Sequence, residues 1–65
     1  MKFKFIGQQT ILANLIPNNI YNILQFEVVG NHFCIYVIDE ENELTVIPYK
    51  SMERFNENWS YMNND

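Results

Sequence analysis

Apolar and polar residues alternate in the first part of the chain, and this pattern predicts a strand over residues 2–6. Phe3 and Phe5 fall on one face of that strand, and Lys2 and Lys4 fall on the other. A strand with one apolar face and one charged face is half-buried, so we expect the two phenylalanines in the core.

Residues 20–29 form a second run that is rich in β-branched and aromatic side chains, which favours another strand. The adjacent Ile23 and Leu24 break strict alternation, so we expect either cover on both faces or a β-bulge at this point. We expect one face to carry Tyr21, Ile23 and Gln25. The other face is expected to carry Ile20, Leu24 and Phe26.

Two turn signals divide the following region into hairpins. Gly30 tolerates positive φ and connects the second run to an alternating run over residues 32–38. The polar run 39–43 predicts a second hairpin tip, which leads into a strand over residues 44–47. Pro48 lacks the backbone donor that a central strand requires, so we expect it to end that strand.

The long segment between the first two strands has a looser pattern. Pro17 and the asparagines after it end any helix that forms there. We therefore expect a loop with apolar anchors and at most one helical turn. The anchors, which have helical spacing, are Ile11, Leu12, Leu15 and Ile16.

The last part of the chain predicts one helical turn and a short strand. Ser51 is suited to cap a single α or 3₁₀ turn over residues 51–55. A final short strand is expected around Trp59 and Tyr61.

The predicted order is a strand, a long loop, three consecutive antiparallel strands, a helical turn and a final strand, which is the order of an SH3-like barrel. We therefore predict a mainly β fold, a small SH3-like barrel of about five antiparallel strands with one short helical turn. Because a chain of 65 residues buries only about 60% of its unfolded surface, it has no material for a second core. We expect a single domain over residues 1–62 and a frayed tail over 63–65.

Several short motifs support this fold. They are the opening strand 3–7, the runs 15–21 and 36–39, and Ile47-Pro48 followed by Met52 and Phe55. In these positions the chain resembles a large group of small uncharacterised SH3-like barrel proteins of low-GC bacteria and their phages. The group usually has glycines where this chain has Asn18 or Asn19 and Asn42, and asparagine tolerates left-handed backbone best after glycine. The resemblance implies a fold and no activity.

The cysteine content and the apolar runs indicate a compartment. Cys34 is the only cysteine, so no internal disulfide can form, which favours a reducing cytoplasm. No apolar run approaches the roughly 20 residues of a membrane span, and the first five residues are too polar for the core of a signal peptide. We expect a cytoplasmic protein that does not contact a membrane.

Residues with catalytic or metal-binding chemistry are few. On a strand, His32 and Cys34 would point to the same face, where an imidazole and a thiol can form a base and nucleophile pair. No third orienting group accompanies them, so we favour ordinary packing over catalysis. The acidic run 39–43 lacks the alternating ligands and central glycine of a calcium loop. We expect no catalytic residue, no metal and no cofactor.

The charge balance disfavours nucleic acid as a ligand. Eight acidic and four basic residues give a net charge of −4, which repels polyanions. The basic side chains make a thin footprint even if they gather on one face, and we favour a solvated surface. They are Lys2, Lys4, Lys50 and Arg54.

The acidic run 39–43 is the strongest candidate for function. It is either a solvated hairpin tip or a prong that docks into the basic groove of a nucleic-acid-handling protein in competition with phosphate. Nearby aromatic side chains would add contact area, although Trp59 is also a core candidate. The predicted partner-binding residues are Tyr36, Asp39, Glu40, Glu41, Glu43, Tyr49 and Trp59.

We therefore predict a non-enzymatic protein-interaction module, of the kind that phages and mobile elements encode, that binds and modulates a host protein. One alternative is a nucleic-acid-associated small barrel that uses its basic residues and stacks bases on exposed aromatics. The other is a structural homo-oligomer that pairs exposed strand edges.

Overall fold

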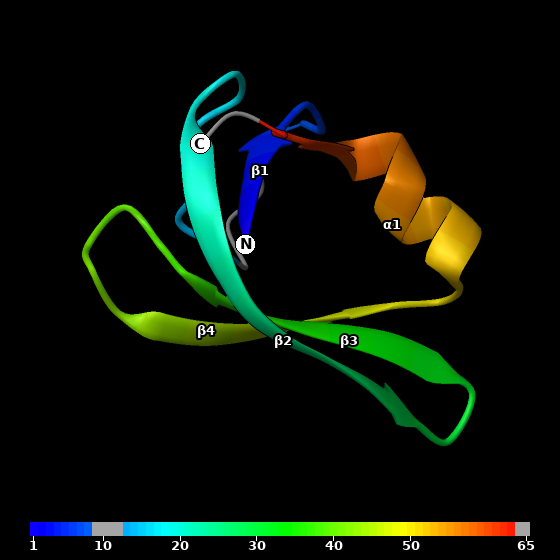
Figure 1. Ribbon diagram of the computed structural model, residues 1–65. Coiled ribbons are helices and arrows are strands. Elements are labelled where there is room, and N and C mark those ends of the chain that lie inside the picture. The colour runs from blue at the N-terminus through cyan, green and yellow to red at the C-terminus, as the bar shows by residue number, and fades with distance from the viewer. Residues whose placement is uncertain (9–12, 64–65) are drawn as a thin grey trace.

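Five strands and one short helix follow one another in a computed structural model that describes residues 1–8 and 13–63 (Figure 1). The elements are β1 (Lys2–Phe5), β2 (Ile20–Val29), β3 (His32–Ile38), β4 (Leu44–Tyr49), α1 (Met52–Asn58) and β5 (Trp59–Tyr61). The predicted fold class is confirmed, because the described residues are mainly β with five antiparallel strands and one short helical element.

The strands form one sheet in the order β4-β3-β2-β1-β5, which is the strand order of an SH3-like barrel. β2 pairs with β1 through residues 20–22 and with β3 through residues 23–29. It therefore belongs to both halves of the sheet, and Figure 1 shows it as one long, curved strand. The three consecutive strands β2, β3 and β4 make one half, and β5, β1 and the start of β2 make the other.

A β-bulge in β2 reverses which side chains face inward. The register with β3 shifts between Ile23 and Gln25, which confirms the bulge among the two expected arrangements. Tyr21 and Ile23 are buried before the shift, whereas Gln25 is exposed and Phe26 packs against the core after it. The expected sides of Gln25 and Phe26 are therefore wrong, because one extra residue inverts the period-2 alternation.

The buried core joins four strands, α1 and the loop before β2. Phe3 and Phe5 lie in it, as their alternation with lysines predicts. Phe55 brings α1 into the core, since its ring centroid lies 5.5 Å from that of Phe3 and 5.4 Å from that of Phe26. The buried cluster consists of Phe3, Phe5, Leu15, Tyr21, Ile23, Ile35, Val37, Phe55 and Trp59.

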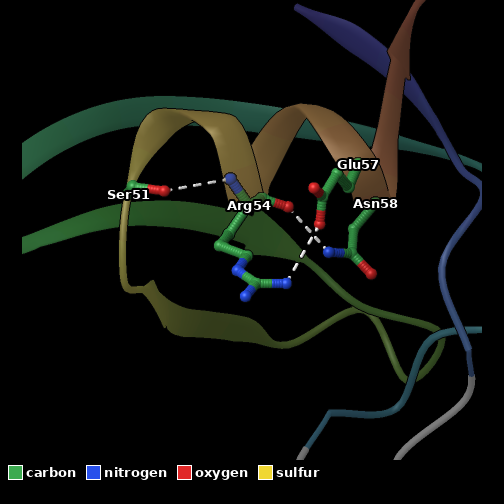
Figure 2. Close-up of polar contacts among 4 residues, drawn as sticks. All are labelled: Ser51, Arg54, Glu57 and Asn58. Carbon is green, nitrogen blue, oxygen red and sulfur yellow. Dashed lines mark hydrogen bonds and ion pairs between the residues drawn. The ribbon is translucent and has the colours of Figure 1, made fainter.

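α1 begins at the predicted cap but runs over seven residues, which is longer than the single turn expected. The Ser51 hydroxyl accepts a hydrogen bond from the Arg54 amide at 3.2 Å (Figure 2). In the last turn, Asn58 Nδ2 donates to the Arg54 carbonyl at 2.7 Å. The Asn58 carbonyl accepts the Ile6 amide at 2.8 Å, and a Cβ at Gly7 would lie 2.1 Å from Asn58 Oδ1. A larger residue at position 7 would therefore require the Asn58 side chain to move.

β4 continues through Pro48, so the prediction that this proline ends the strand is wrong. Pro48 pairs with Cys34 of β3, and the strand ends one residue later at Tyr49. β4 is the terminal strand in the sheet order. An edge strand tolerates proline because one of its sides makes no ladder hydrogen bonds.

The described part of the segment before β2 is a loop that anchors Leu15 in the core and leaves Ile16 at the surface. Residues 13–19 contain a turn and no helix. Asn18 has a φ of 77° in this turn, a left-handed conformation that asparagine tolerates best after glycine. The two other predicted anchors, at positions 11 and 12, lie outside the described residues.

The chain after α1 returns to the first strand. β5 pairs with β1, and the Met62 amide donates to the Lys2 carbonyl at 2.9 Å. Of the predicted tail, residues 64 and 65 lie outside the described residues.

Candidate interaction surface

The tip of the β3–β4 hairpin is organised around the carboxylate of Asp39. This group accepts hydrogen bonds from the amides of Glu41 at 2.9 Å and Glu43 at 3.0 Å, and from the Thr45 hydroxyl at 2.9 Å. The bond from the Glu43 amide lowers the pKa of Asp39 most, and those from Thr45 and Glu41 add to it. Asn42 completes the turn with a φ of 62°. Asp39 therefore holds the turn together and has little accepting capacity left for a partner.

Glu40 ties the tip to the chain before β2. Its carboxylate accepts hydrogen bonds from the Tyr21 hydroxyl and from Asn19 Nδ2, the latter at 2.9 Å, and its amide donates to the Asn14 carbonyl at 3.0 Å. Both side-chain hydrogen bonds lower the pKa of Glu40, and the bond from Tyr21 has the larger effect. The Tyr21 hydroxyl in turn accepts the Ile16 amide at 2.7 Å. Glu40 is thus part of an internal clasp, although the sequence placed it in the partner-binding set.

Glu40, Glu41 and Glu43 are all exposed at the tip, but the carboxylates of Glu41 and Glu43 take no part in the clasp or the turn. Within the described part of the chain, neither carboxylate accepts a hydrogen bond or forms an ion pair. Their backbone amides serve the turn, and their carboxylates project into solvent. Of the four acidic residues predicted to bind a partner, these two have carboxylates available for one.

The register of the hairpin separates the acidic turn from the predicted aromatic residue Tyr36. Val37 is fully buried and pairs with Thr45, whose hydroxyl binds Asp39. Asp39 therefore lies on the inner side of the hairpin, the side that carries Val37. Tyr36 pairs with Val46 on the outer side. Asp39 and Tyr36, which the sequence treats as parts of one site, are therefore on opposite sides of the same two strands.

The outer side of the hairpin carries an apolar surface that sequence reasoning missed. We call it the hairpin face, and it consists of Tyr36, Ile38, Leu44 and Val46. Leu44 is 57% exposed and Val46 is 48% exposed, while Tyr36 and Ile38 are half-buried. Exposed apolar side chains that cluster on one strand pair are typical of a binding surface. The signal was present in β4, where apolar residues occupy both alternating sets of positions.

Tyr36 is fixed on this face by Glu27, another residue that the sequence did not single out. The Tyr36 hydroxyl donates to Glu27 Oε1, and this bond to a carboxylate raises the pKa of Tyr36. The Tyr36 hydroxyl is therefore tied to β2, and Tyr36 pairs across the hairpin with Val46. A pre-positioned aromatic ring loses little conformational entropy when a partner covers it.

Of the two other aromatic residues predicted to bind a partner, Trp59 is buried and Tyr49 is half-buried beside it. Trp59 is only 3% exposed and its ring packs 5.1 Å from that of Phe5. Its Nε1 donates to the Tyr49 hydroxyl at 2.8 Å, and burial raises the pKa of Tyr49. In this structure a partner cannot reach the Trp59 ring, because that ring is buried in the core.

The other residues with reactive side chains are dispersed. His32 is exposed and Cys34 is buried on β3. The described residues contain no group of three His, Cys, Asp or Glu side chains that could hold a metal ion. Among the basic residues, Arg54 pairs with Glu57 on the surface of α1 at 3.3 Å (Figure 2).

An apolar groove of about 420 Å³ runs beside β4. Its walls include buried core side chains, and its polar lining comes from Gln8 and Asn58. An apolar group of modest size would fit there. The described lining residues are Phe5, Gln8, Ala13, Leu15, Val46, Ile47, Pro48, Tyr49 and Asn58.

Comparisons with known proteins identify no relative of this chain, so the function is inferred from the structure alone. No family model matches the chain, and no curated protein and no solved structure matches it. Among the described residues, no helix has both the length and the apolar character needed to cross a membrane.

Proposed function

We propose that this protein is a non-enzymatic protein-interaction module that binds a partner protein through the hairpin face and the exposed carboxylates at the end of it. The observation that carries the proposal is the exposure of Leu44 and Val46 beside the positioned ring of Tyr36. A surface of this kind buries apolar area when a partner covers it, which is the main favourable term in protein association.

The chemistry of the partner follows from the charges around the face. Glu41 and Glu43 stand at the tip, next to the Leu44 end of the hairpin face. A complementary surface would present an apolar patch with lysine or arginine at its edge, since opposite charges at the rim orient an interface and speed its formation. In a phage-related protein such a partner would belong to the host, and nucleic-acid-handling proteins offer basic surfaces of this type.

The test is an affinity capture with three tagged forms of the chain: the native form, Val46→Asp and Val28→Asp. Val28 is the matched control, because it is an exposed valine at the far end of β2, with an exposed fraction of 72%, and lies off the hairpin face. We expect a stoichiometric partner that the native and Val28→Asp forms retain and the Val46→Asp form loses. Circular dichroism spectra of the three forms should coincide.

Retention of the same proteins by all three forms would contradict the proposal. A second pair of variants addresses the charges, with Glu41→Lys as the test and Glu53→Lys as the control. Both change one exposed carboxylate to an amine, but Glu53 lies in the first turn of α1, away from the hairpin. We expect only Glu41→Lys to weaken the captured complex, by slowing its formation.

A further inference from the structure

We infer that a second copy of this chain is a partner of the hairpin face, in a two-fold dimer in which the two β4 strands run antiparallel across the interface. The inference rests on the proposed function, because it uses the same face. It adds that the chain itself carries the complementary surface: an apolar patch with a basic residue at its edge.

The hairpin face has opposite charges at its two ends. Glu41 stands at the tip, where Leu44 begins β4. At the other end, Lys50 directly follows β4 and continues the alternate set of positions that Leu44 and Val46 occupy. It lines a hollow that Val28, His32 and Met52 also line. Both Glu41 and Lys50 are exposed. Along β4 the outer surface therefore runs from an acidic end, through Leu44 and Val46, to a basic end.

This polarity selects one symmetric arrangement. A two-fold axis that lies in the plane of the interface and perpendicular to β4 reverses the strand direction in the second copy. The acidic tip of each copy then meets the Lys50 end of the other, and the apolar side chains of the two copies meet in the middle. An axis along β4 would instead place Glu41 opposite its own copy, which like-charge repulsion disfavours.

Glu41 and Lys50, the charges that this arrangement pairs, form no ion pair with another described residue of the same subunit. Arg54 and Glu57 form the only ion pair within residues 1–8 and 13–63. Glu41 and Lys50 are therefore available for contacts between copies. Leu44 and Val46 are about half exposed in one copy, and covering them would remove apolar surface from water in both.

Sedimentation velocity over a concentration range of about 1 μM to 1 mM, which spans weak and moderate dissociation constants, tests the inference. We expect the native chain to dimerise as its concentration rises and the Val46→Asp form to stay monomeric. The control is Ile20→Asp, which should behave like the native chain, because Ile20 is 47% exposed and pairs with Lys4 in the other half of the sheet. A native chain that is monomeric throughout this range, or a dimer that Val46→Asp leaves unchanged, would overturn the inference.

A charge exchange tests the orientation. We expect Glu41→Lys and Lys50→Glu each to weaken the dimer about 10-fold, because one reversal creates two like-charge contacts across a two-fold axis. The double variant Glu41→Lys with Lys50→Glu restores opposite charges and should return the dissociation constant to within about threefold of the native value. A double variant that is as weak as the single ones would rule out the antiparallel arrangement.

Failure of this inference and failure of the proposed function give different results. A chain that is monomeric at every concentration, but loses its captured partner on Val46→Asp, keeps the proposed function and excludes the second copy. A monomeric chain whose Val46→Asp form captures the same proteins as the native form excludes both. A dimer that Val46→Asp dissociates supports the inference, whatever else the chain captures.

Discussion

The inner and outer sides of the β3–β4 hairpin carry similar side chains but differ in how far these are buried. On the inner side, Ile35 and Val37 are fully buried under β1, α1 and β5 side chains of the core. On the outer side, Leu44 and Val46 stay about half exposed. Both sides are apolar, so composition does not distinguish them. What differs is whether another part of the chain covers them, and the uncovered side is the one available for a partner.

The four carboxylates of the tip divide in the same way. Asp39 and Glu40 accept hydrogen bonds from the turn and from the clasp with Tyr21, so they serve the fold. Glu41 and Glu43 point into solvent. Adjacent residues of the same type therefore have structural or interaction roles according to the donors within their reach.

The largest difference between the two sides should appear in core truncation. We expect Ile35→Ala to lower the free energy of unfolding by about 2–5 kcal/mol, since it leaves a cavity in a fully buried site. The matched truncation on the outer side, Val46→Ala, should change it by less than about 0.5 kcal/mol. Urea unfolding measures both. Equal losses would show that the outer side is also part of the core.

The next largest difference in the free energy of unfolding should appear between Tyr21, which belongs to the clasp with Glu40, and Tyr36, which lies on the hairpin face. Tyr21→Phe removes the donor to Glu40 and the acceptor of the Ile16 amide, so we expect a loss of about 1–3 kcal/mol. Tyr36→Phe removes only a surface bond to Glu27 and should cost less. Urea unfolding of the two variants compares them directly. If Tyr36→Phe lowers the free energy of unfolding as much as Tyr21→Phe, the Tyr36 hydroxyl also supports the fold and the distinction between the two tyrosines is wrong.

Low pH should weaken the hydrogen bonds that the carboxylates of Asp39 and Glu40 accept. The folded-state pKa values of Asp39 and Glu40 are lowered by the hydrogen bonds that their carboxylates accept. Their contribution is therefore fully present above the unfolded-state values of about 4 and is lost as the pH falls through the folded-state values. We expect stability to fall as the pH drops below about 4, and Asp39→Asn with Glu40→Gln to flatten that dependence. Thermal unfolding between neutral and acidic pH measures it, and an unchanged slope would contradict the role of the clasp.

The smallest effect on stability is expected from the two exposed carboxylates. Glu41→Gln with Glu43→Gln removes two negative charges, as Asp39→Asn with Glu40→Gln does, but it breaks no side-chain hydrogen bond between described residues. We expect the midpoint of thermal unfolding at neutral pH to stay unchanged, while binding at the hairpin face weakens. A marked drop in that midpoint would assign these carboxylates to the fold as well.

Local patterns were sufficient for the order of the elements, but they missed the length of α1, the end of β4 and the composition of the site. The lysine and phenylalanine alternation of β1, the cap at Ser51 and the fold class are confirmed, because each depends on residues close together in sequence. The predicted partner-binding set mixed residues that the structure separates. Glu40 and Trp59 face internal partners from distant parts of the chain, and no local pattern reveals such partners.

The sequence by itself determined the order of the strands, the turns between them and the amphipathic character of β1. Alternation, helix caps and positive-φ turn residues act over a few neighbouring positions, so they can be read without the fold. Only the tertiary structure decided which apolar side of the hairpin is covered, since this depends on the bulge in β2 and on the packing of β1, α1 and β5. A period-2 pattern defines two faces of a strand, and burial of one of them requires surfaces from the rest of the chain.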